Sequence, residues 1–257
     1  MYNGISKWGI TLKSKKGKIK AILFDSGRVL NQSSTGHWFI SPRFFEYVNS
    51  EIYNSIEREK INGAFRKAGE YINSQNLIKT KEEEYIHFEK FYKIFSDILP
   101  ELELKEIQIK ALAMDLVYNS DKYRFFDDAL KVIPELKLKY RLAIVSDAWP
   151  SLKDVYEKNE LYNYFDSFVI SSILGITKPN EKMYLKAIEE LGILPEEAIF
   201  IDDNLINCKG AMKLGIKGIL LCRNKFQYCI YKLFSLGKGY KVINNLNQLK
   251  DEEVLCR

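Results

Sequence analysis

Short apolar runs that end in polar residues recur along this chain. Residues 19–24, 142–145 and 199–201 are rich in the apolar and β-branched types that favour buried strands, and polar side chains follow each run. From about residue 124 onward, helical patterns fill the intervals between such runs. Because strands that alternate with helices usually pair in parallel and are covered on both faces, the pattern predicts an α/β fold with a parallel sheet.

The same pattern places the other elements of this sheet. Gly192 and Gly215 each follow a helical segment, as glycines that end helices do. Further strands are expected at residues 168–170, 218–221 and 241–243, and helices at 127–139, 151–161, 181–191, 205–214 and 225–236.

Between about residues 44 and 118 the strand-like runs disappear and helical spacing takes over. Phe88, Phe91 and Phe95 recur every three or four positions, which is typical of an amphipathic helix. This segment predicts an insert of about four helices between the first and second strands, with its aromatic residues as a core. The stretch before it, residues 31–45, holds aromatic residues among Ser, Thr, Gly and Pro, and predicts a small hairpin or flap over the first strand's end.

The expected domains follow from this change of pattern. A length of 257 residues exceeds the usual size of a single core, which agrees with one core plus an insert. We expect the core at residues 18–36 and 120–250, the flap and helical cap at 37–119, and a basic N-terminal extension at 1–17.

Composition and charge exclude several classes of protein. The net charge of +5 is mild and the two signs are mixed, so no nucleic-acid partner is expected. No run of about 18 apolar residues could span a membrane. The first residues lack the apolar core and cleavage site of a signal peptide, and the four cysteines show no metal-binding spacing. These features predict a cytoplasmic protein with reduced thiols, either a monomer or a homodimer.

Polar residues at the predicted strand ends form the candidate site. They are Asp25, Ser146, Lys178 in the loop after a strand, and the pair Asp202 and Asp203. Carboxyl ends of parallel strands share one edge of the sheet, so these side chains should converge. Without a cation, some of the converging carboxylates would have to stay protonated. Mg²⁺ prefers carboxylate oxygens as ligands, and a lysine with a hydroxyl suits an anionic substrate. Together these groups predict a phosphoryl-transfer site.

Four motifs in a fixed order resemble those of the haloacid dehalogenase-like hydrolase superfamily. They are FDSGRVL, IVSD, the Lys-Pro after SSILGIT, and FIDDNLINCKGA, and the resemblance runs from about residue 18 to residue 222. It implies a Rossmann-like core with a helical cap inserted after the first motif. It also implies a Mg²⁺-dependent phosphatase that acts on a small phosphorylated metabolite.

The resemblance also implies catalytic roles for three residues. Asp25 would be the nucleophile and would form an aspartyl-phosphate that water hydrolyses. Ser146 and Lys178 would hold the phosphoryl oxygens, and Lys178 would ease the repulsion between Asp25 and the incoming phosphate.

A metal site is implied beside the nucleophile. Asp25, the carbonyl of Gly27 and Asp203 would hold Mg²⁺, and Asp202 would support them or act as a further ligand. Asn207 would brace the loop through hydrogen bonds.

Two positions depart from the family's pattern. Phosphatases of this superfamily commonly carry a second aspartate two residues after the nucleophile, where it acts as general acid and base, but this chain has Gly27. General acid–base help is worth roughly 10²–10⁴-fold, so its loss favours a substrate with a good leaving group, such as an anomeric sugar phosphate or an acyl phosphate. Asp147, counted among the substrate contacts, stands where the family often has asparagine.

Several alternatives stay open from the sequence. Arg28, His37 and Trp38 are candidate substrate contacts, although a surface charge explains Arg28 equally well. The pair at residues 202–203 could instead cap helix 205–214. The chain could also be a metal-free 2-haloacid dehalogenase, which shares the missing second aspartate, or a non-catalytic binding protein of the same fold.

Overall fold

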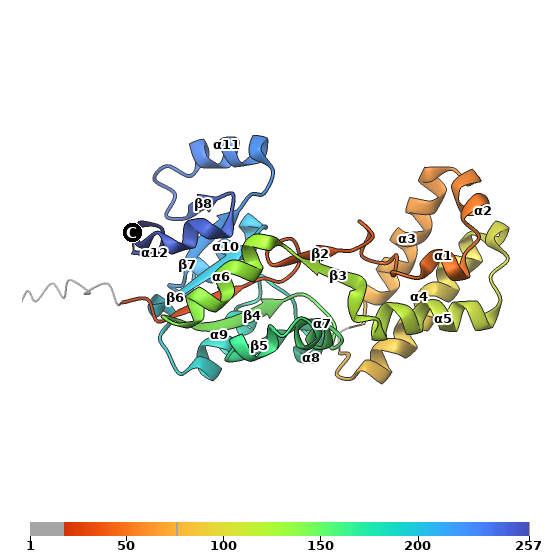
Figure 1. Cartoon of the computed structure of the whole chain (residues 1–257), viewed down its shortest axis with the longest axis horizontal. Coiled ribbons are helices and arrows are strands. Elements are labelled where there is room, and N and C mark those ends of the chain that lie inside the picture. The colour runs from red at the N-terminus through yellow and green to blue at the C-terminus, as the bar shows by residue number, and fades with distance from the viewer. Residues whose placement is uncertain (1–17, 76, 257) are drawn as a thin grey trace, which may run out of the picture.

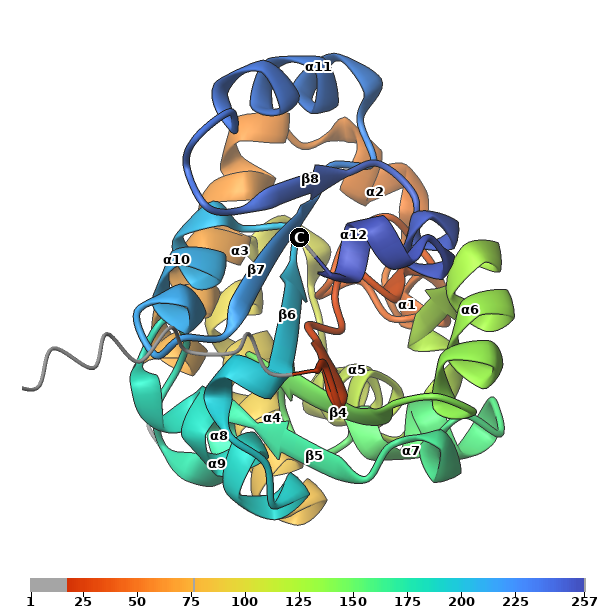
Figure 2. The ribbon, with the colours of Figure 1, turned by 90° about the vertical axis from the view of Figure 1, so that its left-hand side faces the viewer.

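The computed structural model describes residues 18–75 and 77–256, so the predicted basic extension at 1–17 lies outside the described residues. Six strands of the described chain form one parallel sheet in the order β5-β4-β1-β6-β7-β8 (Figures 1 and 2). They are β1 (Ala21–Phe24), β4 (Arg141–Ser146), β5 (Ser167–Ile170), β6 (Ala198–Asp202), β7 (Lys217–Leu221) and β8 (Lys241–Ile243). The predicted α/β class is therefore confirmed.

Helices cover both faces of this sheet, as Figure 2 shows. Successive side chains of a strand point to opposite faces. Ile22 and Phe24 of β1 pack in the cluster that contains α6 and α7, whereas Leu23 packs in the cluster that contains α9. Burial on both faces is why β1 is apolar at every position. The core helices are α6 (Asp127–Lys137), α7 (Leu152–Lys158), α8 (Ser171–Leu174), α9 (Glu181–Leu191), α10 (Leu205–Met212), α11 (Lys225–Phe234) and α12 (Glu252–Cys256).

A group of helices between β2 and β3 stands away from the sheet (Figure 1). Its own buried cluster contains Phe88, Phe91 and Phe95, the aromatic residues predicted to form such a core. The described residues form five α-helices here rather than about four, because two of them span only a few residues. They are α1 (Phe44–Tyr47), α2 (Ser50–Ser55), α3 (Arg58–Asn73), α4 (Lys81–Ile98) and α5 (Glu106–Tyr118). We refer to these helices as the cap.

A two-stranded antiparallel ribbon joins the cap to the core. β2 (Asn31–Ser33) pairs with β3 (Tyr123–Phe125), and Asn31 lies opposite Phe125. The prediction of a small hairpin within residues 31–45 was therefore wrong, because the strand pairs with the chain that returns from the cap. The ribbon fixes both crossings between the two parts of the molecule.

A buried polar network lies at the same junction. Lys122, in the 3₁₀ helix η2 (Ser120–Lys122), donates to Ser151 Oγ at 2.5 Å and to the Leu116 carbonyl at 2.9 Å. Ser151, at the start of α7, donates its N–H to Glu84 of α4 at 2.8 Å. The cap helix α4 is thereby tied to the core helix α7. The other 3₁₀ helices are η1 (Pro100–Leu102), η3 (Tyr162–Tyr164), η4 (Pro195–Glu197) and η5 (Leu246–Lys250).

None of the helices in the described part of the chain is long and apolar enough to cross a membrane.

Candidate active site

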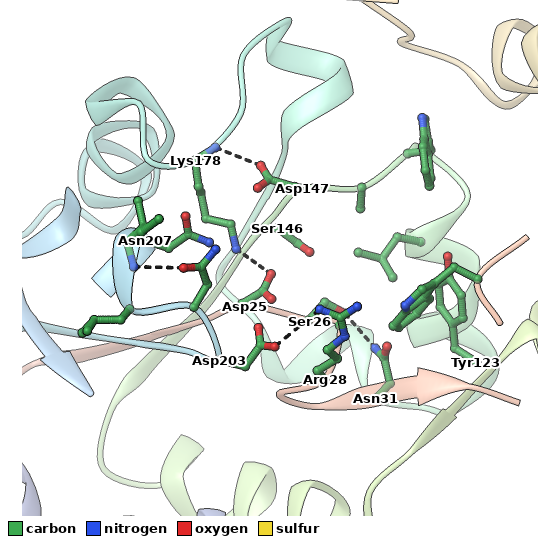
Figure 3. Close-up of a pocket in the computed structure, with 18 of the residues that line it drawn as sticks. Asp25, Ser26, Arg28, Asn31, Tyr123, Ser146, Asp147, Lys178, Asp203 and Asn207 are labelled. Atoms are coloured by element: carbon green, nitrogen blue, oxygen red, sulfur yellow. Dashed lines mark hydrogen bonds and ion pairs between the residues drawn. The ribbon is translucent and has the colours of Figure 1, made fainter. Parts of the chain in front are cut away.

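The ends of three neighbouring strands bring the first site residues together. Asp25 directly follows β1 and continues its pairing with β6, since its N–H donates to the Ile201 carbonyl at 2.9 Å. Ser146 is the last residue of β4 and Asp202 the last of β6. β4 and β6 flank β1 in the sheet, so the three side chains meet at one edge. Figure 3 shows Asp25 and Ser146 side by side at the cavity.

Lys178 reaches into this cluster from the loop after α8. Its Nζ lies 2.6 Å from Asp25 Oδ1 and 2.8 Å from Asp202 Oδ2, and its side chain is buried. Burial alone would lower the pKa of Lys178, but the carboxylates of Asp25, Asp202 and Asp147 outweigh it and raise that pKa. Lys178 therefore carries a fixed positive charge beside Asp25.

Asp202 is fully buried and holds the lysine and the following loop. Its Oδ1 accepts the Asn204 N–H at 2.7 Å, and its Oδ2 accepts a hydrogen bond from Asn207 Nδ2 at 3.0 Å as well as the lysine contact. Burial, followed by the charge of Asp25, raises the pKa of Asp202 to about 7, although Lys178 opposes the shift. The alternative that Asp202 and Asp203 cap α10 was wrong, because Asn204 accepts the Ile206 N–H there.

Three carboxylates form a candidate metal site. Oxygens of Asp25, Asp202 and Asp203 all lie within 4.8 Å of one another. Asp203 is partly exposed, and Arg28 Nη1 lies 3.7 Å from its Oδ2. Burial and then the charge of Asp25 raise the pKa of Asp203. Because the charged forms of Asp202 and Asp203 are disfavoured, this cluster fits a hard divalent cation, which takes oxygen ligands.

Asp147 turns toward the loop that carries Lys178. Its Oδ1 accepts the Lys178 backbone N–H at 2.9 Å, while the side chain is exposed to the cavity (Figure 3). Partial burial raises the pKa of Asp147. A second carboxylate beside a phosphate would repel it, and this hydrogen bond to an amide donor offsets part of that repulsion.

A cavity of about 730 Å³ opens above these residues. Gly27, Ser146 and Asp203 line it on the side of the core, together with Asp25 and Lys178. The rest of the lining is largely apolar: Tyr123, which lies away from Lys178 in Figure 3, is joined by Trp38, Phe39, Trp149 and the aliphatic Leu152. We call these five residues the aromatic wall. Among the described residues that line the cavity, none belongs to the cap helices α1 to α5.

Of these wall residues only Trp38 was predicted as a contact, and Phe39, Tyr123, Trp149 and Leu152 were not. Trp149 lies three residues beyond Ser146 on the loop after β4, and a large aromatic residue so near a strand end could have been considered. Tyr123 reaches the cavity only because β3 pairs with β2, which no local pattern indicates.

The three candidates near the first motif have different positions. Arg28 and Trp38 line the cavity. His37 does not: its ring packs on Phe65 of α3 at 4.3 Å between centroids, and its Nδ1 accepts the Phe39 N–H at 3.2 Å. Burial among these groups lowers the pKa of His37. The prediction that His37 contacts substrate is therefore corrected, because its ring is turned into the cap.

Comparison with known proteins gives consistent matches. A family model described as haloacid dehalogenase-like hydrolase matches residues 19–215. The glyceraldehyde 3-phosphate phosphatase of Methanopyrus kandleri is 24% identical over 221 residues, which cover 81% of this chain and 86% of that protein.

Solved structures share the fold. A HAD phosphatase from Thermococcus onnurineus matches with a TM-score of 0.60 at 22% identity, covering 93% of this chain and 98% of that one. The L-2-haloacid dehalogenase from Xanthobacter autotrophicus with covalently bound chloropropionic acid matches with a TM-score of 0.57 at 18% identity, covering 90% and 96%.

Proposed function

The chain belongs to the haloacid dehalogenase-like hydrolase family, and we propose that it is a Mg²⁺-dependent phosphatase that acts on a small phosphorylated metabolite. One observation carries this proposal: the Lys178 ammonium lies 2.6 Å from Asp25 Oδ1, beside two further carboxylates. A nucleophilic carboxylate, a fixed cation and an acidic pair that fits a divalent ion are the groups that phosphoryl transfer requires.

Asp25 is the proposed nucleophile. One of its oxygens attacks phosphorus, and a new O–P bond forms while the ester P–O bond breaks and the alcohol oxygen leaves with the electron pair. Lys178 would reduce the repulsion between Asp25 and the phosphate, and Ser146 would donate a hydrogen bond to a phosphoryl oxygen. Water then attacks phosphorus and breaks the bond to Asp25, which releases inorganic phosphate and restores the carboxylate. The proton that the water loses to solvent balances the proton that the departing oxygen takes from solvent.

Asp25, Asp203 and the Gly27 carbonyl are the proposed ligands of Mg²⁺. When bound, the cation would supply positive charge for the phosphoryl oxygens. Both carboxylate oxygens of Asp202 accept hydrogen bonds, which favours a supporting role over direct ligation. Asn207 helps to hold Asp202 in that orientation.

The curated relatives support the substrate class in coarse terms. Several of them are named glyceraldehyde 3-phosphate phosphatases, which supports a small phosphate ester as substrate. Arg28, Trp38 and Asp147 line the cavity and are the proposed substrate contacts beyond the phosphoryl site. A cytoplasmic location and a monomeric or homodimeric state belong to the same proposal.

A metal-free dehalogenase is the rival function, since Gly27 removes the second aspartate and dehalogenases share the fold. The acidic cluster argues against it, because a site without a metal gains nothing from crowding Asp203 against Asp25. A binding protein without turnover is weaker still, since Asp25, Ser146 and Lys178 are all in place.

The decisive experiment measures phosphate release from an aryl phosphate with and without Mg²⁺, for the wild-type protein and for Asp25→Asn. We expect release that requires Mg²⁺ and is abolished by the substitution. Halide release from a 2-haloacid without metal would instead support the dehalogenase. Folded protein that releases neither product would support the binding protein, and circular dichroism of the variant would exclude loss of folding as the cause.

A further inference from the structure

The aromatic wall differs in chemistry from the rest of the cavity. The charged residues that line the cavity all come from the core, and Figure 3 shows Asp25, Asp147 and Lys178 grouped together with Arg28 between Asp203 and Asn31. The aromatic wall itself, among the described residues, contains no charged side chain. Burial raises the pKa of Tyr123, so its hydroxyl stays neutral as well. One end of the cavity thus suits a phosphate, and the other end suits an apolar group.

The cap holds this wall in place from behind. The ring of Phe39 packs on Phe91 of α4 at 4.7 Å between centroids, and Trp149 packs edge-on against Phe88 at 5.1 Å. Trp38 meets the Tyr123 ring at 5.1 Å. Although the cap helices contribute no lining residue among those described, they therefore hold the rings of Phe39 and Trp149, while Trp38 and Tyr123 pack on each other. A wall with fixed rings loses little conformational freedom when a planar ligand stacks against it.

Trp38 of the wall also lies against Gly27, the position at which the family's second aspartate is missing. A Cβ added at Gly27 would lie 3.3 Å from Trp38 Cη2 and 3.6 Å from Cζ2. The indole therefore lies in tight contact with the point where the side chain of a second aspartate would begin, and it would have to move by a few tenths of an ångström to admit that side chain. Without that acid, the departing oxygen must carry its negative charge with little protonation, which favours an alcohol of low pKa. A phenol, with a pKa near 10 as in tyrosine, meets this requirement far better than an aliphatic alcohol.

These two observations lead to one substrate class. We propose that the enzyme hydrolyses aryl phosphates, with the aromatic ring of the leaving group stacked on the wall formed by Trp38, Phe39, Tyr123 and Trp149. This inference rests on the proposed phosphatase function and names its substrate class. A sugar or triose leaving group would bring hydroxyl groups against rings that offer them few partners, which costs binding. The anomeric sugar phosphates suggested by Gly27 alone are therefore less suitable.

Binding of phosphonates, which cannot be hydrolysed, isolates recognition from leaving-group reactivity. Isothermal titration calorimetry of the Mg²⁺-loaded protein should give phenylphosphonate an affinity roughly tenfold or more above that of methylphosphonate. Trp38→Ala should remove most of this difference, and Trp38→Leu, which keeps apolar volume and guards against a folding defect, should remove part of it. Phe226→Ala is the matched control, because this ring is 75% exposed on α11 and does not line the cavity.

Turnover provides the second readout. We expect kcat/KM for phenyl phosphate to exceed that for glycerol phosphate and for glyceraldehyde 3-phosphate by roughly 10²-fold or more. Trp38→Ala should lower the value for the aryl ester more than for the aliphatic esters. Equal binding of the two phosphonates, or preference for glyceraldehyde 3-phosphate, would overturn the inference and leave the phosphatase standing. Failure to release phosphate from any ester would overturn the proposed function itself.

Discussion

The indole of Trp38 lies against the α-carbon of Gly27, close enough that a Cβ added there would sit 3.3 Å from ring atom Cη2. The two residues are eleven positions apart in the sequence, and both line the cavity that contains the candidate nucleophile. Gly27 therefore does two things: it removes a carboxylate, and its lack of a Cβ lets the indole approach the loop. The tryptophan crowds the space that the Cβ of an aspartate would enter, so the glycine and the indole form one feature of this cavity.

Restoring the second aspartate should fail for this reason. We expect Gly27→Asp to lower the free energy of unfolding by about 1–3 kcal/mol, the usual cost of overpacking, without raising the hydrolysis of an alkyl phosphate. Adding Trp38→Ala should recover most of the lost stability. Urea denaturation and initial rates of the single and double variants test this. Gly63→Asp is the control, since a Cβ at Gly63 would lie no closer than 3.8 Å, to Arg66 Nη2. An active Gly27→Asp enzyme with unchanged stability would contradict the prediction.

Lys178 should be needed for both activity and folding. Lys178→Met leaves Asp25 and Asp202 buried without their shared cation. We expect a loss of roughly 3–5 kcal/mol in the free energy of unfolding at neutral pH. The loss should be smaller near pH 5, where Asp202, whose pKa is raised, can take up a proton. kcat should fall by roughly 10²–10³-fold. Lys213→Met, at an exposed position, should change neither quantity. A variant with normal kcat would remove Lys178 from the catalytic site.

The local sequence pattern was sufficient to predict the strands of the parallel sheet and the polar residues at their carboxyl ends. Parallel strands are buried on both faces, so β1, β4 and β6 appear in the sequence as continuous apolar runs. Asp25 follows the apolar run of β1, and Asp202 ends β6. Because β1 and β6 are parallel neighbours in the sheet, these two carboxylates converge. Helix α9 begins and ends at the predicted residues because Asn180 and Gly192 act as local caps.

The features that the sequence did not predict depend on contacts between residues far apart in the chain. The ribbon pairs Asn31 with Phe125, and no local pattern specifies a partner so far along the chain. Tyr123 enters the cavity through that pairing. His37 and Trp38 are neighbours in an irregular segment, and packing against Phe65 or Tyr123 decides which ring faces the cap and which faces the cavity. Short irregular segments lack the periodicity that would indicate such directions.

The stability of the metal-free protein should fall as pH rises toward neutrality. In the folded state Asp202 has a pKa raised to about 7, so it binds a proton that the unfolded chain, with a pKa near 3.9, has released. The stability from this proton is fully present below about pH 4 and is lost as pH rises through about 7. Lys178, whose pKa is also raised, keeps its charge throughout this range. In the presence of EDTA, denaturant unfolding should therefore show lower stability at pH 7.5 than at pH 5.

Two comparisons separate this effect from other titrations. Millimolar Mg²⁺ should reduce the difference between the two pH values, because a bound cation replaces the proton in offsetting the carboxylate charges. Asp202→Asn should flatten the dependence in EDTA, because the amide does not titrate. A chelated wild-type protein that is more stable at pH 7.5 than at pH 5 would show that Asp202 is ionised throughout.

The buried network between cap and core should behave as a coupled unit. Lys122 and Glu84 lie 4.0 Å apart and share Ser151 as a hydrogen-bonding partner. Burial lowers the pKa of Lys122 and raises that of Glu84, so each needs the other to stay charged. We expect Lys122→Met or Glu84→Gln alone to cost roughly 3–5 kcal/mol in the free energy of unfolding. The double variant should cost less than the sum, with a coupling of roughly 0.5–3 kcal/mol.

A surface ion pair on the same cap helix supplies the control for this cycle. Lys93 and Asp97 of α4 lie 2.8 Å apart, with more than half of each side chain exposed. The cycle of Lys93→Met and Asp97→Asn should give a coupling of only about 0–1 kcal/mol, because water screens the pair. Equal couplings at the two sites would mean that Lys122 and Glu84 are not charged together. In that case the hydrogen bonds through Ser151, rather than an ion pair, would join the cap to the core.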